Sequence, residues 1–207
     1  MAHHQKQPNK WQRLFFWLLG ANVFVVIAII ALIFWPVSET TPPDPAENHT
    51  QPSSEFTVRT TKQNLNELIN AYLDKLLEGS GHQYSVSLDD DVELVGELPV
   101  FSSTVPLSVH LEPIVQENGD IILKQQSISI GQLALPNKKI MDYLQQYLPM
   151  PAWVTINPAD AEIYVAVTDM DIKSNFQVSV KQIDLEANNL TFNIDVPYRT
   201  LGIETED

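Results

Sequence analysis

The 207-residue sequence contains no cysteine and only seven glycines, and its 12 basic residues are outnumbered by 26 acidic residues. The lack of cysteine excludes disulfide bonds, thiolate nucleophiles and cysteine-ligated metal sites. The few glycines form no glycine-rich phosphate-binding loop. The first 35 residues contain no aspartate or glutamate, so residues 36–207 hold 26 acidic and 9 basic residues, a net charge of −17. This acidic part disfavours nucleic-acid binding, because it repels the phosphate backbone.

A single membrane span is predicted at residues 14–35. The run LFFWLLGANVFVVIAIIALIFW has 22 residues and no charge, which is long enough to cross a hydrocarbon core of about 30 Å. A cleaved signal peptide is the alternative, but its apolar region has roughly 7–15 residues and a small-residue cleavage site. Because Lys6, Lys10 and Arg13 precede the run and acidic residues follow it, the positive-inside rule places residues 1–13 in the cytoplasm and the C-terminal part outside the cell.

Residues 36–54 are predicted to form a disordered linker. Five of the 17 residues from Pro36 to Pro52 are proline, and most of the others are polar. Such a segment cannot bury enough apolar surface to offset the entropy lost on ordering. The remaining residues, 55–207, are predicted to form one extracytoplasmic domain.

Two amphipathic helices are predicted in this domain. In the first, apolar residues recur with the helical period: Leu65, Leu68, Ile69, Tyr72, Leu73, Leu76 and Leu77. Thr60 or Thr61 can cap its start, and Gly79-Ser80-Gly81 ends it. The second helix follows Pro136 and is expected to run from Asn137 to Leu148.

Alternating apolar and polar residues predict strands in the rest of the domain. We expect them at residues 92–100, 105–111, 121–130, 154–156, 163–167, 176–180 and 190–196. Asn118-Gly119 is a strong signal for a hairpin, and Gly131 is expected to shift the strand register. These hairpin-type connections predict an α+β domain with a curved antiparallel sheet, apolar on one face.

No catalytic constellation is predicted. His110 lies on the polar side of its strand and is interpreted as a solvated histidine. The acidic groups Asp89-Asp90-Asp91 with Glu93, and Asp169-Met170-Asp171, are interpreted as charged turns, because they lack the central glycine of a calcium loop. We therefore predict no cofactor, no metal and no enzymatic activity. A hydrolase with a dispersed acid pair is a less favoured alternative.

Several packing and turn motifs carry a resemblance to a known family. They are Val105-Pro106-Leu107-Ser108-Val109, Glu117-Asn118-Gly119-Asp120-Ile121-Ile122-Leu123, the run from Ile128 to Pro136, Ile183-Asp184-Leu185, and Leu190-Thr191-Phe192. From the span to the last strand, the chain resembles the YpmS-like family of membrane-anchored proteins found mainly in Gram-positive bacteria. That resemblance supplies no catalytic residues. The element Gly131-Gln132-Leu133-Ala134-Leu135-Pro136 before a helix is also similar to tubular lipid-binding domains, an analogy of fold alone.

Two non-enzymatic functions are predicted. The first is a module that binds a lipid or another amphiphile of the cell envelope. Its proposed cleft is lined by Leu73, Leu77, Val109, Leu111, Ile140 and Leu144, with Trp153 near the mouth. The alternative for these residues is an ordinary dry core. The second function is a scaffold or partner protein for an envelope enzyme, which would use a sheet edge or the segment Met150-Pro151-Ala152-Trp153.

Overall fold

A computed structural model describes residues 10–33, 53–81, 83–100, 103–131, 137–172 and 175–202. The chain divides into two compact units, residues 1–36 and residues 37–207. The first unit contains the helix α1 (Lys10–Ile33). Its segment Arg13–Ala31 is long and apolar enough to cross a membrane, and none of it is buried. By length and composition this gives weak support to a membrane anchor. The last two residues of the predicted span lie outside the described residues.

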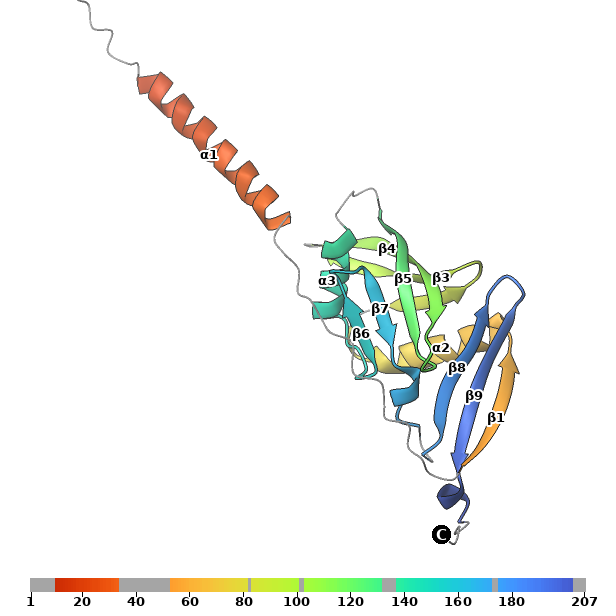
Figure 1. Ribbon diagram of the computed structural model, residues 1–207. Helices are drawn as coiled ribbons and strands as arrows, with labels where there is room; N and C mark the ends of the chain where they lie inside the picture. Colours follow the sequence, from red (N-terminus) through yellow and green to blue (C-terminus); the bar gives the residue numbers. More distant parts are fainter. Residues whose placement is uncertain are drawn as a thin grey trace, which may run out of the picture. The chain divides into compact units, whose positions relative to one another are not determined.

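The second unit contains two antiparallel sheets (Figure 1). A six-stranded sheet has the order β2-β3-β4-β5-β7-β6, and a three-stranded sheet has the order β1-β9-β8. The strands are β1 (Ser53–Thr60), β2 (Tyr84–Leu88), β3 (Val92–Val100), β4 (Ser103–Val115), β5 (Ile121–Ile130), β6 (Val154–Asn157), β7 (Glu162–Val165), β8 (Gln177–Asp184) and β9 (Asn189–Pro197). The helices are α2 (Lys62–Leu76), α3 (Asn137–Tyr147) and the short 3₁₀ helices η1 (Val167–Asp169) and η2 (Tyr198–Leu201).

The helix α2 begins and ends where the sequence predicts. Thr61 is its N-cap, and the hydroxyl of Thr61 accepts a hydrogen bond from the backbone N–H of Asn64. This satisfies one of the free donors at a helix start. After the C-cap residue Leu77, Gly79 takes a left-handed φ of 79°, a conformation that glycine adopts without steric cost.

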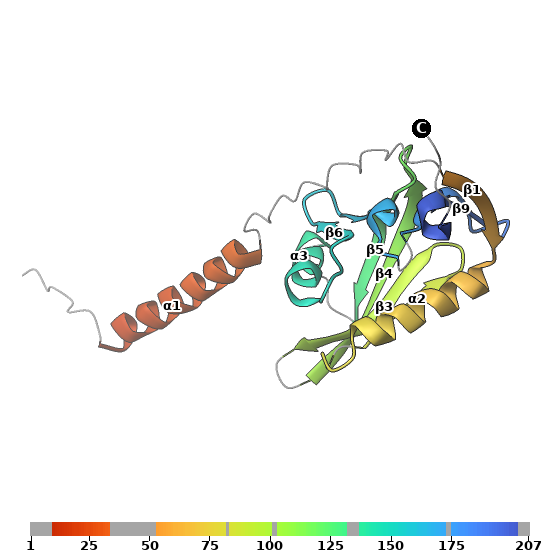
Figure 2. The same ribbon diagram turned by 90° about the horizontal axis from the view of Figure 1, so that it is seen from below.

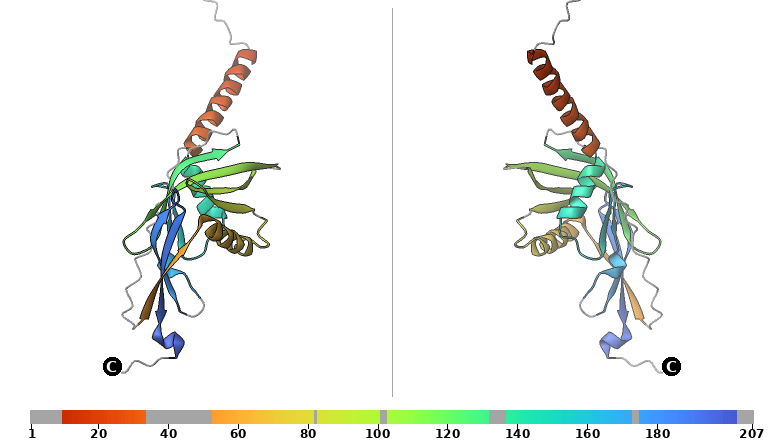
Figure 3. Two further views of the ribbon diagram at one scale, coloured as in Figure 1. Left: turned by 90° about the vertical axis from the view of Figure 1, so that its right-hand side faces the viewer. Right: turned by 90° about the vertical axis from the view of Figure 1, so that its left-hand side faces the viewer.

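The core lies between the six-stranded sheet and the two helices. Figures 2 and 3 show the strands β3 to β5 curving over α2 and α3, which lie on the same face of the sheet. The helix α3 buries Ile140, Met141 and Leu144. These side chains share one hydrophobic cluster with the inward-facing residues of β4, which are Leu107, Val109 and Leu111. The predicted α+β class and curved antiparallel sheet are confirmed.

The turn between β4 and β5 connects several elements of the fold. Asp120 is 1% exposed, and its carboxylate accepts hydrogen bonds from the Asn118 amide (2.7 Å), the Tyr164 hydroxyl (2.5 Å) and both the N–H and hydroxyl of Thr168 (3.0 and 2.9 Å). The neighbouring Gly119 carbonyl accepts a hydrogen bond from Val180 N–H of β8 at 2.7 Å. The turn therefore joins the two sheets.

Two strands differ from the expectation. The strands β1 and β2 are not predicted, and Ser53 and Ser54, assigned to the linker, belong to β1. The partner of β1 is β9, with Ser53 opposite Pro197, so its pairing depends on residues at the far end of the chain. As a result the domain has a second sheet, which local patterns did not indicate.

A register shift that was not predicted occurs between His110 and Leu111, which face Ser127 and Gln125, so Gln126 is the extra residue of a β-bulge. Gly131 follows β5 with φ 51°, and its N–H donates to the Pro106 carbonyl. The register shift expected at Gly131 stays a prediction. The other residues of the element that begins at Gly131, 132–136, lie outside the described residues.

We expect Asp120→Ala to lower the free energy of unfolding by about 3–4 kcal/mol, because several buried donors lose a charged acceptor together. Tyr164→Phe removes only one of these hydrogen bonds and should cost about 1–2 kcal/mol. Urea unfolding of residues 37–207, followed by circular dichroism, measures both values. Equal losses in the two variants would show that the carboxylate is not the shared acceptor.

Candidate functional site

The structure divides the seven predicted lipid contacts into two groups. Val109, Leu111, Ile140 and Leu144 are at most 4% exposed and belong to the hydrophobic core. Leu77 is also buried, whereas Leu73 and Trp153 are half-buried. The first four residues thus come together in the structure, where they pack β4 against α3. The other three lie on α2 or beside it.

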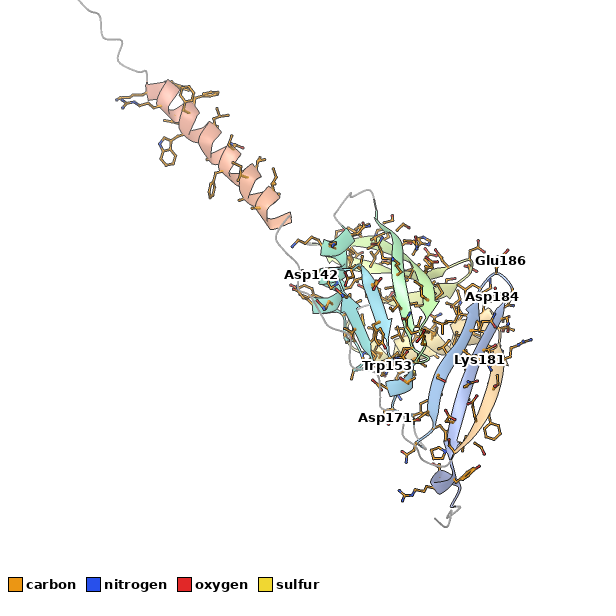
Figure 4. All side chains as sticks on the ribbon, in the orientation of Figure 1. Asp142, Trp153, Asp171, Lys181, Asp184 and Glu186 are labelled. Atoms are coloured by element: carbon orange, nitrogen blue, oxygen red, sulfur yellow. The ribbon has the colours of Figure 1, made fainter. Side chains whose placement is uncertain are left out.

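The apolar stripe of α2 is only partly covered by the rest of the domain. None of its described residues is fully buried, and Leu68 and Tyr72 are 67% and 40% exposed. The Tyr72 ring contacts the Trp153 ring, with their centroids 5.7 Å apart. Trp153 precedes β6 and is labelled in Figure 4. Leu68, Tyr72 and Trp153 therefore form an apolar surface on the flank of α2, which we call the α2 flank.

The position of α2 at the margin of the sheet explains this exposure. Its Asn70 side chain pairs with the edge strand β2 through two hydrogen bonds of 2.8 Å, one to the Val86 carbonyl and one from the Val86 N–H. This pairing satisfies backbone groups that a neighbouring strand would otherwise bind. A helix in this position covers the edge of the sheet, so one of its sides faces outward.

An open groove with a volume of about 540 Å³ begins where α2 ends. Its lining combines apolar and polar residues from α2 and its C-cap, from β2 and the residue before it, and from β3 and β4: Asp74, Leu77, Gln83, Tyr84, Ser85, Val95, Gly96, Glu97 and Pro106. Tyr84 lies opposite Gly96, and a Cβ at Gly96 would be only 2.1 Å from the Tyr84 ring. Gly96 thus allows the aromatic ring to lie against the backbone of β3.

The groove is open to solvent, and its volume falls within the range of ligand sites. Ligand sites commonly have volumes of about 300–1,000 Å³ and combine apolar walls with a few polar groups. Burial, with a smaller contribution from Tyr143, raises the pKa of Tyr84 to about 12. The Tyr84 hydroxyl therefore stays neutral at physiological pH and donates to the Glu97 carbonyl at 3.3 Å. Asp74 and Glu97 make the groove unfavourable for anions.

A polar cluster lies on the face of the six-stranded sheet that points away from the hydrophobic core. His110 is not simply solvated as predicted, because its Nδ1 is 2.9 Å from Asp91 Oδ2 and its Nε2 is 3.3 Å from Ser108 Oγ. The pairing of β3 with β4 places Glu93 opposite His110. The Ser108 hydroxyl donates a hydrogen bond to the Glu93 carboxylate at 2.7 Å. Since that hydroxyl proton is held by Glu93, Ser108 is not arranged as a nucleophile activated by His110. The cluster lines neither the α2 flank nor the groove.

The acidic residues Asp89, Asp90 and Asp91 lie in the turn between β2 and β3. Among the described residues, no group of three or more histidine, aspartate or glutamate side chains is positioned to hold a metal ion. Asp89 to Asp91 form a tight bend in which the Asp89 N–H donates to the Asp91 carbonyl at 3.1 Å. The predictions of no metal, no cofactor and no enzymatic activity stay predictions.

The groove was missed because β2 was missed. Tyr84, Val86 and Leu88 alternate with serines, a pattern that indicates a short half-buried strand. Gly96 within a predicted strand was a second signal, since such a glycine often marks the close approach of another group. These two signals indicate a short strand and a close approach at Gly96, and the register of β2 and β3 then pairs Gly96 with Tyr84.

We expect stability to fall between pH 10 and pH 12, because an unfolded tyrosine ionises near its ordinary pKa of 10.0 and the pKa of folded Tyr84 is about 12. The folded state holds its proton more tightly, so this contribution is fully present below pH 10 and is lost above it. The pKa of Tyr164 is also raised, mainly by burial and by its hydrogen bond to Asp120. Urea midpoints across this range should fall less for Tyr84→Phe than for the wild type, and parallel curves would contradict the assignment.

Comparison with known proteins identifies the family. The profile described as "Uncharacterized protein conserved in bacteria (DUF2140)" matches residues 9–196. The chain is 30% identical over 185 residues to the Bacillus subtilis (strain 168) protein named "Uncharacterized protein YpmS", covering 89% of this chain and 96% of that protein. No solved structure matches. The resemblance to YpmS-like proteins is confirmed, and the chain belongs to this conserved bacterial family.

Proposed function

We propose that the protein is a membrane-anchored extracytoplasmic module that binds the alkyl part of an envelope lipid or a similar amphiphile. The observation that supports the proposal is the open side of α2, where Leu68 and Tyr72 are exposed beside Trp153. Leu73 and Leu77 continue from this flank toward the groove. Three of the predicted lipid contacts, Leu73, Leu77 and Trp153, thus belong to the proposed site.

The energetics are adequate for a single alkyl chain. Each buried CH₂ contributes about 0.8 kcal/mol, so a chain of about eight carbons gains roughly 6 kcal/mol before ordering costs. The net charge of −17 after residue 35, together with Asp74 and Glu97 at the groove, opposes anionic headgroups. We therefore favour an uncharged headgroup.

In this proposal the other four candidates support the site without touching the ligand. Leu144 is 0% exposed, so a charged substitution there would place an unpaired charge in the core and unfold the domain. A substitution at Leu144 therefore cannot distinguish a loss of ligand binding from a loss of folding. A substitution at the exposed residue Leu68 can distinguish them.

The scaffold function remains the alternative. Tyr147 of α3 is 60% exposed and stacks on Tyr143 with ring centroids 4.6 Å apart. Tyr143 is half-buried and packs against the core, so Tyr147 is the exposed member of this pair. An exposed tyrosine near the segment 150–153 suits contact with a protein, since tyrosine is enriched at interfaces. This reading requires no bound lipid.

Binding of a fluorescent monoacylglycerol to residues 37–207, purified without detergent, tests the amphiphile proposal. Leu68→Glu should weaken binding at least tenfold, because burying one leucine is worth about 1.5–3 kcal/mol. Gln63→Glu changes an exposed residue on the opposite side of α2 and should bind like the wild type. A fluorescent fatty acid should bind more weakly than the neutral probe.

Two results would contradict this proposal. The first is a wild-type protein that binds neither probe and yields no lipid on organic extraction and mass spectrometry. The second is equal binding by the Leu68 variant and the control. Either result would favour the scaffold function.

The proposed orientation has a separate test. Protease added to intact protoplasts should degrade residues 37–207, because the basic residues before α1 favour a cytoplasmic N-terminus. A cytoplasmic protein in the same cells should stay intact. Protection of the domain in intact protoplasts, with degradation after lysis, would reverse the orientation.

A further inference from the structure

The two sheets present four edge strands, which differ in how their outer edges are protected. These edges are β2 and β6 of the larger sheet, and β1 and β8 of the smaller one. An unprotected edge exposes backbone donors and acceptors that bind another strand. Proteins usually cover, shorten or distort such edges.

Three of the four edges are protected. The edge of β2 is covered by α2 and its Asn70 side chain. The strand β6 has only four residues, and its Ile156 carbonyl accepts a hydrogen bond from Gln145 of α3 at 2.7 Å. The strand β8 is bulged at Lys181, and its Val180 N–H is bound to Gly119. Figure 4 labels the charged Lys181, Asp184 and Glu186 on β8 and its turn.

The fourth edge, β1, carries the charged residues Glu55 and Arg59, but it is not covered, shortened or bulged in the described part of the chain. All eight of its residues pair with β9 on one side, and no described strand, helix or side chain is hydrogen-bonded to its outer side. Figure 1 shows β1 at the margin of its sheet, on the side away from β8. The strand also exposes Phe56 (55%) and Val58 (42%), which lie on one face.

The sequence of β1 is complementary to itself in an antiparallel register. With Thr57 opposite Thr57 of a second copy, Glu55 faces Arg59 and Phe56 faces Val58. Opposite charges and apolar pairs directly across two strands are favourable. Within the described residues, neither Glu55 nor Arg59 has an ion pair of its own. We propose that two copies of this chain associate through their β1 strands, with a two-fold axis at Thr57.

This arrangement joins the two small sheets into one, with the order β8-β9-β1-β1-β9-β8. The axis is perpendicular to the sheet, so Phe56 and Val58 of both copies lie on the same face and cover one another. Glu55 and Arg59 lie on the opposite face and form two equivalent pairs. A C₂ contact of this type closes on itself and does not extend into a fibre. The inference is independent of the proposed amphiphile site.

A single cysteine on the axis tests the register, because the natural chain has no cysteine. Directly opposite residues in an antiparallel pair have Cα atoms about 4.5–5.5 Å apart, within the usual disulfide range of about 4.4–6.8 Å. Thr57→Cys in the full chain, in mild detergent, should therefore form a disulfide-linked dimer on oxidation. Ser53→Cys is the matched control, since the two copies of residue 53 would lie about 27 Å apart.

Charge reversal in the Thr57→Cys background tests the pairing. Glu55→Arg alone and Arg59→Glu alone each place like charges opposite one another and should weaken dimerisation about tenfold. The double change Glu55→Arg with Arg59→Glu restores both pairs and should restore cross-linking. Circular dichroism checks that each exposed-site variant keeps its fold.

Three outcomes would overturn the proposal. The first is a Thr57→Cys protein that stays monomeric. The second is equal cross-linking through residues 53 and 57, which would indicate random collision. The third is a double charge reversal that cross-links no better than the single changes.

Discussion

The buried carboxylate of Asp120 is the interaction on which the arrangement of the second unit depends. It accepts hydrogen bonds from β7 through Tyr164 and from η1 through Thr168, and so fixes the turn between β4 and β5. The adjacent Gly119 has φ 88°, and a Cβ there would lie 2.5 Å from the Cβ of Ser179. Only glycine allows both this turn and the close approach of β8. These two consecutive residues therefore help to set the position of the small sheet, together with Leu185 and Leu190, which belong to the shared hydrophobic core.

The elements with local signals were predictable, and those formed by distant pairing were not. A capping threonine and a complete apolar stripe predicted α2, and Asn118-Gly119 predicted the turn after β4. Apart from Asn118, the partners of Asp120 have no local signal, because Tyr164 and Thr168 lie 44 and 48 residues later. The same limit applies to β1, whose pairing with β9 joins opposite ends of the domain. The first two residues of β1, Ser53 and Ser54, follow a proline-rich segment and look like part of a linker until the partner strand is known.

The candidate site shows a different limit of sequence patterns. An apolar stripe predicts which side of a helix is buried, but it does not say whether protein or ligand covers that side. Ile140 and Leu144 on α3 are covered by the sheet, whereas Leu68 and Tyr72 on α2 stay exposed. The difference arises because α3 packs within the core and α2 lies along the β2 edge. The apolar residues recur with the same period in both helices. Only the position of each helix in the fold therefore decides whether its apolar residues are core or candidate surface.

The open side of α2 and the open edge of β1 have a common physical origin. A sheet that curves over its helices has two margins, and each helix covers only the strands beneath it. By pairing with Val86 through Asn70, α2 closes the β2 margin, and this position leaves Leu68 and Tyr72 uncovered. The small sheet receives no helix across β1 in the described residues, so its margin stays open. The two surfaces therefore lie on different elements and use different chemistry: side-chain contact at α2, and backbone hydrogen bonding at β1. The two proposals therefore depend on separate contacts, and a test of one does not decide the other.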